Sequence, residues 1–342
     1  MPAKYFIGNI QHGQNKIPVV ADTLKSSDII GALKARWAIN RNNYTVNPGL
    51  YAIGSPDENS RVFVTANYKL SFDHLRENLK GENCWILVLD TKGINVWCAA
   101  GKGTFGTEEL IKQINQTQLT QIVTYRKIIL PQLGAVGVSA HKVKKETGFN
   151  VIYGPVRAAD IPAFLKNQCN ATKEMRTVFF PFYERIKLIP VEIVGYLQYL
   201  LFTMAILFIL AGLNTEGYSL DKAFDGGFKA GIMLLAGFLS GSVLIPALLP
   251  YIPVKRFSLK GAILGFIITG LLVYFFPGKS ILENCSWFFI VPAVSAFIAM
   301  NFTGTSTYTS LSGVLKEMKF AIPLQLSFAF IGIMLWIFAR FI

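Results

Sequence analysis

The sequence carries little charge and few cysteines for its length. Of its 342 residues 15% are charged, whereas a typical soluble domain carries about a quarter. Its mean hydropathy is +0.42. Such a composition excludes a disordered chain and argues against a wholly soluble protein. The four cysteines include no CxxC pair, which excludes a zinc ribbon, a thioredoxin-type motif and a ferredoxin-type cluster run.

The charge is unevenly distributed along the chain. Residues 1–185 hold 23 of the 33 Lys and Arg and 14 of the 20 Asp and Glu, so residues 186–342 are nearly uncharged. We therefore predict a soluble α/β domain over residues 35–185 and a transmembrane helical domain over residues 186–342. Residues 1–34 are set apart as an N-terminal segment of unknown role. The basic residues are scattered, and the net charge of +13 therefore does not predict nucleic-acid binding.

Five apolar stretches in the second half approach the roughly 20 residues that cross a bilayer as a helix. They are residues 193–213, 230–249, 261–276, 287–302 and 322–341, and none includes a deeply placed ionisable residue. Lys and Arg flank one side of this five-span topology at positions 185, 187, 255, 256, 260, 316 and 319. The positive-inside rule then predicts a multi-pass protein of the cytoplasmic (inner) membrane whose soluble domain faces the cytoplasm. The first residues lack the apolar run of a secretion signal, which agrees with this expectation.

One polar stretch interrupts the apolar half. Residues 301–319 are rich in Ser, Thr and Gly. They are expected to form either a loop with a short helix or a polar platform on which the soluble domain docks.

The soluble half alternates strand-like and helix-like patterns. Strands are predicted over residues 61–66, 85–90, 121–125, 128–130 and 150–153, and helices over residues 71–79, 107–114, 135–145 and 158–165. Buried strands that alternate with helices predict a Rossmann-like parallel sheet with both faces covered. A ligand of such a sheet lies beyond the carboxyl ends of the strands, which here are at Asn67, residues 91–102, residues 132–137 and residues 153–155.

The glycine-rich segment after Asp90 allows several interpretations. The P-loop pattern fails there because Gly101-Lys102 is followed by Gly103 and has no glycine at the required position before it. A GxGxxG pattern spans residues 101–106, but it begins too far from the strand to support a dinucleotide site. Residues 94–100 fit two turns of helix that would hold Cys98 at the mouth of the sheet. Cys98 is then a metal ligand, a nucleophile or an ordinary small core residue.

Several segments together resemble a known family. The sequence NVWCAAGKGTFGT (95–107), which follows the strand WILVLDT (85–91), closely resembles the membrane-bound corrinoid protein of the microbial mercury-methylation pair. PGLYAIG (48–54), VFVTANYKLSF (62–72), YRKIILPQLGAVGVSAH (125–141) and NFTGTSTYTSLSGV (301–314) extend the resemblance over residues 35–342. More broadly, the first half is similar to the corrinoid-binding domain of the large subunit of the corrinoid iron–sulfur protein.

The resemblance implies a corrinoid-dependent methyltransferase. It implies a cobalamin-type corrinoid in the base-off form, with Cys98 as the catalytic residue and lower axial cobalt ligand. The implied cofactor-binding residues are Asn95, Val96, Trp97, Cys98, Ala99, Ala100, Gly101, Lys102, Thr65, Asn67, Gly134 and Gly137. A thiolate opposite the methyl group would favour its transfer from methyl-cobalt to inorganic Hg(II) with carbanion or radical character, giving methylmercury. Implied partners are a ferredoxin-like protein with two [4Fe–4S] clusters, a folate-level methyl donor system and membrane lipid.

Two other functions are compatible with the sequence. One is a corrinoid methyl carrier of one-carbon metabolism with a different methyl acceptor. The other, of a different class, is a membrane transport or corrinoid-sensing protein, which ionisable residues lining a cavity between the spans would favour.

Overall fold

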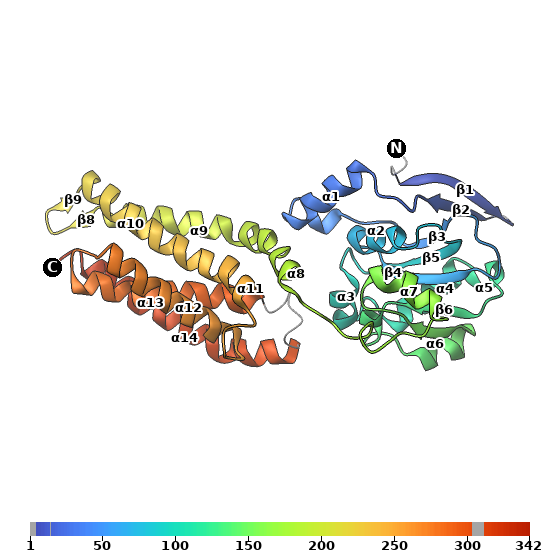
Figure 1. Ribbon diagram of the computed structural model, residues 1–342. Helices are drawn as coiled ribbons and strands as arrows, with labels where there is room; N and C mark the ends of the chain where they lie inside the picture. The colour runs from blue at the N-terminus through green and yellow to red at the C-terminus, as the bar shows by residue number, and fades with distance from the viewer. Residues whose placement is uncertain (1–4, 14, 303–310) are drawn as a thin grey trace. The chain divides into compact units, whose positions relative to one another are not determined.

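The computed structural model describes residues 5–13, 15–302 and 311–342 (Figure 1). Its backbone contacts divide the chain into two compact units, Met1–Phe179 and Phe180–Ile342. This division falls six residues before the boundary drawn from composition. The described part of residues 1–34 belongs to the first unit, and two of its strands join the sheet described next.

A sheet of seven strands organises the first unit. The strands are β1 (Phe6–His12), β2 (Asn15–Val20), β3 (Gly49–Ile53), β4 (Arg61–Ala66), β5 (Cys84–Leu89), β6 (Lys127–Leu130) and β7 (Asn150–Tyr153). Their order is β1-β2-β3-β5-β4-β6-β7. Strands β5, β4, β6 and β7 pair in parallel, whereas β1 with β2 and β3 with β5 are antiparallel. The prediction of a purely parallel sheet is therefore wrong.

Short connections explain the antiparallel pairs. A parallel crossover needs about a dozen residues or more, but only residues 13–14 join β1 to β2 and only residues 54–60 join β3 to β4. The chain therefore reverses its direction at both places. The helical connections between β4, β5, β6 and β7 are longer, and these strands form the parallel part that the sequence predicted.

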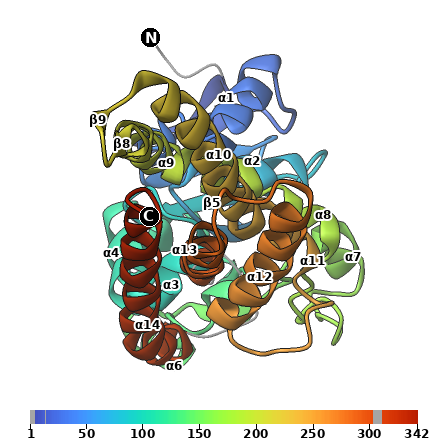
Figure 2. The same cartoon turned by 90° about the vertical axis from the view of Figure 1, so that its left-hand side faces the viewer.

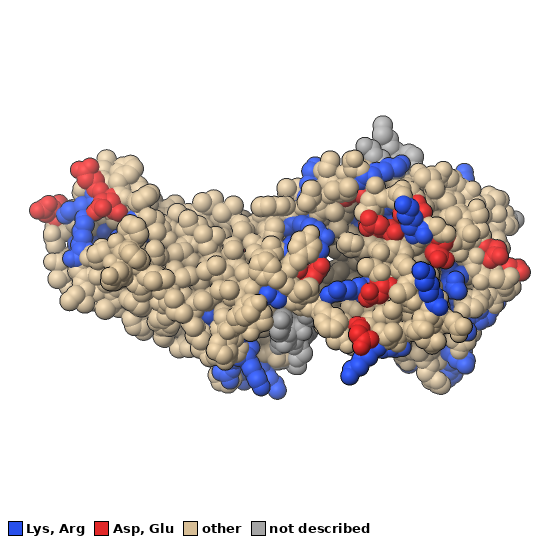
Figure 3. Space-filling model, viewed as in Figure 1, with Lys and Arg blue, Asp and Glu red and all other residues tan. Residues whose placement is uncertain are grey.

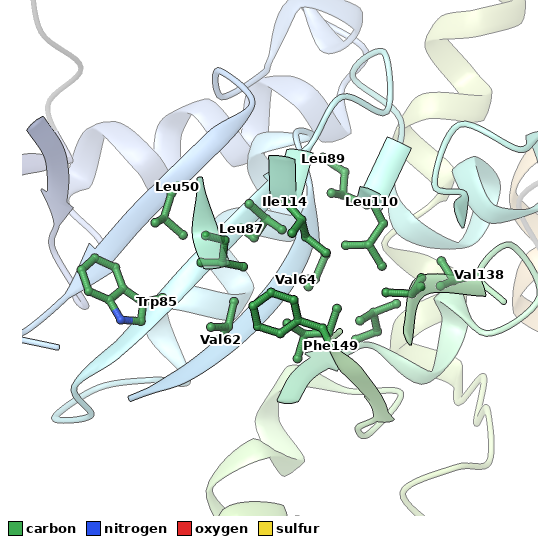
Figure 4. Close-up of a cluster of buried hydrophobic side chains, with 14 of the residues drawn as sticks. Leu50, Val62, Val64, Trp85, Leu87, Leu89, Leu110, Ile114, Val138 and Phe149 are labelled. Carbon is green, nitrogen blue, oxygen red and sulfur yellow. The ribbon is translucent and has the colours of Figure 1, made fainter. Parts of the chain in front are cut away.

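Helices cover both faces of the sheet. Along β5 the side chains alternate, so that Trp85, Leu87 and Leu89 enter one core and Cys84, Ile86 and Val88 enter the other. The first core, seen in Figure 4, includes residues of α3 (Val96–Lys102), α4 (Thr107–Gln116) and α6 (Ala140–Thr147). The second includes residues of α2 (Lys69–Glu77) and α7 (Ile161–Lys166). This two-face burial agrees with the near-continuous apolar sequence of β5.

Several predicted elements differ from the structure. Residues 121–125 do not form a strand, because α5 (Leu119–Ile122) occupies the first of them. The helix predicted from residue 135 begins at Ala140, after a 3₁₀ turn, η2 (Gln132–Gly134). Strands β1, β2 and β3, helix α1 (Ser26–Arg36) and the 3₁₀ turn η1 (Arg41–Asn43) were not predicted. A further 3₁₀ turn, η3 (Ala158–Asp160), leads into α7.

The second unit is a helical bundle with one small hairpin. It contains α8 (Phe182–Ile186), α9 (Ile189–Ala211), β8 (Leu213–Asn214), β9 (Gly217–Tyr218), α10 (Leu220–Leu239), a π-helical turn η4 (Ser240–Leu244), α11 (Ile245–Leu248), α12 (Phe257–Phe275), α13 (Ile281–Asn301) and α14 (Leu311–Phe338). Helix α13 lies between α12 and α14 (Figure 2). Glycine permits this packing, because a Cβ at Gly261 would lie 2.6 Å from the Ala296 Cα atom.

Five helical segments of the described residues are long and apolar enough to cross a membrane. They are Phe182–Ala211, Leu220–Leu248, Phe257–Phe275, Ile281–Asn301 and Gly313–Phe338. They correspond in number and order to the five predicted spans, and all five begin earlier. In the view of Figure 3, Lys, Arg, Asp and Glu are scattered over the first unit, whereas much of the second unit's visible surface has none. Residues 303–310 of the polar stretch 301–319, expected to form a loop or a docking platform, lie outside the described residues.

Candidate functional site

A short capped helix, α3, carries the predicted ligand. It begins because the side-chain Oδ1 of Asn95 accepts a hydrogen bond from the backbone N–H of Cys98, with the two atoms 2.9 Å apart. It ends at Gly103, whose φ of +82° is a left-handed conformation that favours glycine. Asn95 therefore acts on the local backbone of Cys98, as a helix cap.

The two faces of α3 differ in burial. Val96, Ala99 and Ala100 point into the core of the first unit. Trp97 is 40% exposed, and Gly101 and Lys102 are also exposed. Cys98 lies half-buried on this outer face. The helix thus presents a thiol, an indole and an ammonium group on one side while its small residues hold it against the sheet.

The electrostatics of the Cys98 thiol combine opposing effects. Burial raises the pKa of this thiol above its ordinary value, and the nearby charges of Lys102 and Arg41 and a hydrogen bond with Asn95 offset part of that rise. A thiol with a raised pKa is a weak free nucleophile at neutral pH. Coordination to a metal releases the proton in any case. The position therefore suits a metal ligand better than an unassisted nucleophile.

A buried amide holds the loop that leads into α3. The Asn67 Oδ1 atom accepts hydrogen bonds from the backbone N–H groups of Thr91 and Gly93, at 3.1 and 3.0 Å, and lies 2.8 Å from the Thr91 hydroxyl. Its Nδ2 atom donates to Asp90 Oδ1 at 3.3 Å. The side chain of Asn67, which was predicted to bind the cofactor, thus forms its hydrogen bonds with this loop. Thr65, predicted with it, is 3% exposed on β4.

Two predicted glycines hold α3 from the other side. A Cβ at Gly137 would lie 2.2 Å from the Phe105 carbonyl oxygen and 3.2 Å from the Ala100 Cα atom. A Cβ at Gly134 would lie 2.5 Å from the Phe105 ring. Only residues without a side chain permit this approach. The structure therefore brings Gly134 and Gly137 beside the C-terminal end of α3, where they act through packing.

The predicted site residues thus form two groups. Trp97, Cys98, Gly101 and Lys102 share the outer face of α3. Thr65, Asn67, Val96, Ala99, Ala100, Gly134 and Gly137 lie behind that face and support it, and Asn95 joins the two groups as the helix cap. Sequence reasoning missed Arg41, whose charge acts on the thiol from η1. No motif links residue 41 to residue 98, so only the fold could reveal this.

The GxGxxG pattern at residues 101–106 has a different structural role. Gly101 lies inside α3, Gly103 ends it and Gly106 is the N-cap of α4. The pattern therefore joins two helices, whereas a dinucleotide site requires a strand, a tight turn and a helix. This geometry removes the support for nucleotide binding.

A cavity in the second unit bears on the transport alternative. It has a volume of about 560 Å³ and lies among α9, α10, α13 and α14. Its described lining is mostly apolar, with Gln325 among the polar members, and includes no Asp, Glu, Lys, Arg or His. The helices observed in the structure are longer than the predicted spans and contain additional ionisable residues. Among these are Lys229 and Glu283, whose charged atoms are 3.5 Å apart. These residues do not line that cavity.

Comparisons with known proteins find relatives for part of the chain. Residues 19–165 match the family described as CO dehydrogenase/acetyl-CoA synthase delta subunit. Among curated proteins, the acetyl-CoA decarbonylase/synthase complex subunit gamma of Methanopyrus kandleri is 31% identical over 155 residues, which are 44% of this chain and 33% of that protein. The same subunit of Methanocaldococcus jannaschii is 36% identical over 129 residues, 37% of this chain and 26% of that protein.

A third relative is named for a cofactor. The corrinoid/iron-sulfur protein large subunit of Moorella thermoacetica is 33% identical over 123 residues, 35% of this chain and 27% of that protein. The chain therefore spans about a third or less of the length of these relatives. Residues 19–165, which match the family model, contain α3 and strands β3 to β7, and the helical second unit lies outside this range.

Proposed function

We propose that this protein is a corrinoid-dependent methyl-transfer protein of the membrane, that Cys98 is the lower axial ligand of a base-off corrinoid, and that inorganic Hg(II) is the methyl acceptor. One observation carries the proposal. A half-buried thiol stands on the outer face of a capped helix. It lies within residues 19–165, which match the family described as CO dehydrogenase/acetyl-CoA synthase delta subunit, and one relative of the chain is named as a corrinoid/iron-sulfur protein.

The residues present fit a corrinoid. Within the described residues, no group of three or more His, Cys, Asp or Glu is placed to hold a metal ion. The protein would therefore supply one donor atom, while a corrin macrocycle brings its own four equatorial nitrogens. A Cβ at Gly101 would meet no atom within 4 Å, so the surface of α3 is open one turn after Cys98. A soft thiolate is a suitable ligand for a transition metal.

Each residue of α3 then has a defined task. Cys98 would supply a charged, electron-rich donor, which suits methyl delivery to an electrophilic acceptor such as Hg(II). Asn95 keeps the Cys98 backbone in place through the 2.9 Å cap hydrogen bond. Lys102 and Trp97, which are exposed on the same face of α3 as Cys98, would be available to hold the cofactor. When bound, the corrinoid supplies the cobalt–carbon bond that carries the methyl group.

Electrons and methyl groups must come from other proteins in this proposal. The chain has four cysteines, at positions 84, 98, 169 and 285. Within the described residues these cysteines belong to no group of three or more His, Cys, Asp or Glu that could hold a metal ion. We propose a ferredoxin-like partner with two [4Fe–4S] clusters as reductant and a folate-level methyltransferase system as methyl donor. We also propose that the first unit faces the cytoplasm, on the basis of the Lys and Arg distribution.

The test measures methylmercury formed anaerobically from Hg(II) by the purified, methyl-loaded full chain in detergent or nanodiscs. Cys98→Ala is expected to fold, because alanine suits the helix interior, and to lower methylmercury to the background of free methylcobalamin. Cys169→Ala is the matched control, since Cys169 is also half-exposed in the first unit but not on α3. A folded Cys98→Ala protein with full activity would refute the thiolate role.

A second candidate has specific support in the relatives' names. Two of them are subunits of an acetyl-CoA decarbonylase/synthase complex, which favours a methyl carrier of one-carbon metabolism with another acceptor. Bound corrinoid with a Cys98-dependent absorption spectrum, but methylmercury at background, would select this candidate over Hg(II) methylation. Absence of bound corrinoid from both wild type and Cys98→Ala would refute both candidates.

A further inference from the structure

Helix α1 exposes an apolar face that no described part of the chain covers. Ile29, Ile30, Leu33 and Trp37, the last being the C-cap residue, are 52%, 52%, 54% and 48% exposed. With 3.6 residues per turn, these four side chains fall within an arc of about 100°. Ile39 continues the apolar surface just beyond the helix, at 57% exposure. We refer to these five residues as the α1 face.

Positive charge borders the α1 face. Lys34 and Arg36 project at its two edges, given the helical spacing, and Arg41 follows in η1. The acidic residue of the helix, Asp28, is 4% exposed and forms ion pairs with Lys69 and Arg76, each at 2.8 Å. The accessible charges around the face are therefore cationic. An apolar arc with Lys and Arg at its margins is the pattern of a helix that lies in a membrane interface.

Helix α1 is firmly attached on its opposite side. The two ion pairs of Asp28 reach into α2, and the Tyr44 hydroxyl donates to the Asp28 carbonyl oxygen at 3.2 Å. A Cβ at Gly31 would lie 2.5 Å from the Tyr44 hydroxyl oxygen, which shows how closely η1 and α1 pack. The α1 face therefore cannot turn inward without breaking buried charge pairs.

Only a short chain connection separates the first unit from the first candidate membrane span. The carbonyl oxygen of Phe179, the last residue of the first unit, accepts a hydrogen bond from Arg157 at 3.3 Å. The first candidate membrane span begins at Phe182. The soluble unit is thus held beside the membrane by a tether of a few residues, so a weak lipid contact would be strengthened by a high effective concentration.

We propose that the α1 face lies in the interface of an anionic bilayer, with its isoleucine, leucine and tryptophan side chains among the headgroups and Lys34 and Arg36 against lipid phosphates. This proposal assigns a role to a segment that composition left unassigned. It does not depend on the cofactor or on the methyl acceptor. Its consequence is that the soluble unit has a fixed orientation on the membrane, with η1, which contributes Arg41 to the Cys98 environment, beside the lipid.

The test measures quenching of Trp37 fluorescence by brominated lipids in nanodiscs that hold the full chain. Subtracting the emission of a Trp37→Phe protein isolates Trp37 from the other four tryptophans. The Trp37 component is expected to lose most of its intensity when phosphatidylglycerol-containing discs carry lipid brominated near the headgroup. The double variant Lys34→Glu, Arg36→Glu is expected to abolish that loss, and discs of purely zwitterionic lipid are expected to reduce it.

The matched control reverses the charge of two exposed lysines on another helix. Lys142→Glu with Lys144→Glu changes the same number of charges on α6 and is expected to leave the quenching unchanged. A blue-shifted Trp37 component that brominated lipid does not quench would show that protein covers the face and would overturn the proposal. A component with the emission of a water-exposed indole in all discs would overturn it as well, as would equal loss of quenching in the α6 control.

Discussion

The buried charge network that holds the N-terminal segment gives the sharpest stability prediction. Arg76 is 0% exposed. Its Nε atom donates to Asp73 Oδ1 at 2.8 Å, and its Nη2 atom donates to Asp28 Oδ2 at 2.8 Å. Its Nη1 atom donates to the carbonyl oxygens of Ala21 and Thr23 at 2.7 and 2.8 Å. One side chain thus joins α2 to α1 and to the end of β2.

Replacing Arg76 by Met keeps the apolar length of the side chain and removes all four hydrogen bonds. The carboxylates of Asp28 and Asp73 would then share only Lys69, whose Nζ atom is 2.8 and 2.6 Å from them. Removing one partner of a buried charge pair costs about 3–5 kcal/mol. A change of about 1.4 kcal/mol in the free energy of opening changes the exchange rate tenfold. Amide hydrogens of α1 and β2 that exchange through local opening are therefore expected to exchange roughly a hundred to several thousand times faster.

Hydrogen exchange of the full chain, read by mass spectrometry on peptides from residues 15–36, measures this change. Lys112→Met is the control, because Lys112 pairs with Glu109 at 3.5 Å on the surface and its side chain is 54% exposed. Such a pair contributes about 0–1 kcal/mol. If Arg76→Met does not fold, Lys69→Met, which leaves Arg76 joined to both carboxylates, gives a smaller acceleration. Exchange within tenfold of wild type in both variants would refute the assigned role of the network.

Two further predictions follow from the same unit. Gly137→Ala places a methyl group 2.2 Å from the Phe105 carbonyl oxygen, and this overpacking is expected to lower the free energy of unfolding by about 1–3 kcal/mol. The loss should be measured as a lower thermal midpoint and as weaker retention of corrinoid. The control Gly101→Ala meets no atom within 4 Å and is expected to leave the midpoint unchanged. Burial alone would raise the pKa of Asp28, but hydrogen bonds from Lys69 and the Lys25 N–H and the charges of Lys69 and Arg76 hold this pKa below its ordinary value. The ionised Asp28 carboxylate therefore stabilises the fold at neutral pH, and this stabilisation is lost as the pH falls below about 4. Thermal midpoints between pH 7 and pH 3 should show the wild-type advantage over Asp28→Asn shrinking only in that acid range, and an advantage that stays constant would contradict it.

Local sequence patterns predicted two kinds of element: strands that are buried on both faces, and helices with a long apolar sequence. The run of apolar residues in β5 and the helical spacing of apolar residues in α4 each favour one conformation. Any other conformation would expose many apolar side chains. The same reasoning yields the number and order of the five long apolar helices. It failed at residues 121–125, where a single helical turn and a strand have the same short apolar signature, and at β1, whose side chains are mostly exposed or half-buried.

The candidate site divides in the same way. The small residues around Cys98 predicted a short helix over residues 94–100 that bears the thiol. The structure places this helix at Val96–Lys102, with Asn95 as its N-cap and Gly103 as its C-cap. Which residues lie behind that helix depends on contacts between distant segments. Asn67 therefore proved to be a support for the loop, and Gly134 and Gly137 proved to be points of close packing.

By itself the sequence determined the division into a polar and an apolar half, the alternation of strands and helices around β5, and the short helix that carries Cys98. These depend on composition and on interactions between near neighbours. Only the tertiary structure decided that β1, β2 and α1 belong to the first unit, that the Arg41 charge lies near the Cys98 thiol, and that α1 turns an apolar face outward. The physical reason is that Asp28 lies 41 residues before Lys69 and 48 residues before Arg76 along the chain. The buried charges of Asp28 and of the α2 residues Lys69, Asp73 and Arg76 are compensated only when the fold brings α1 against α2.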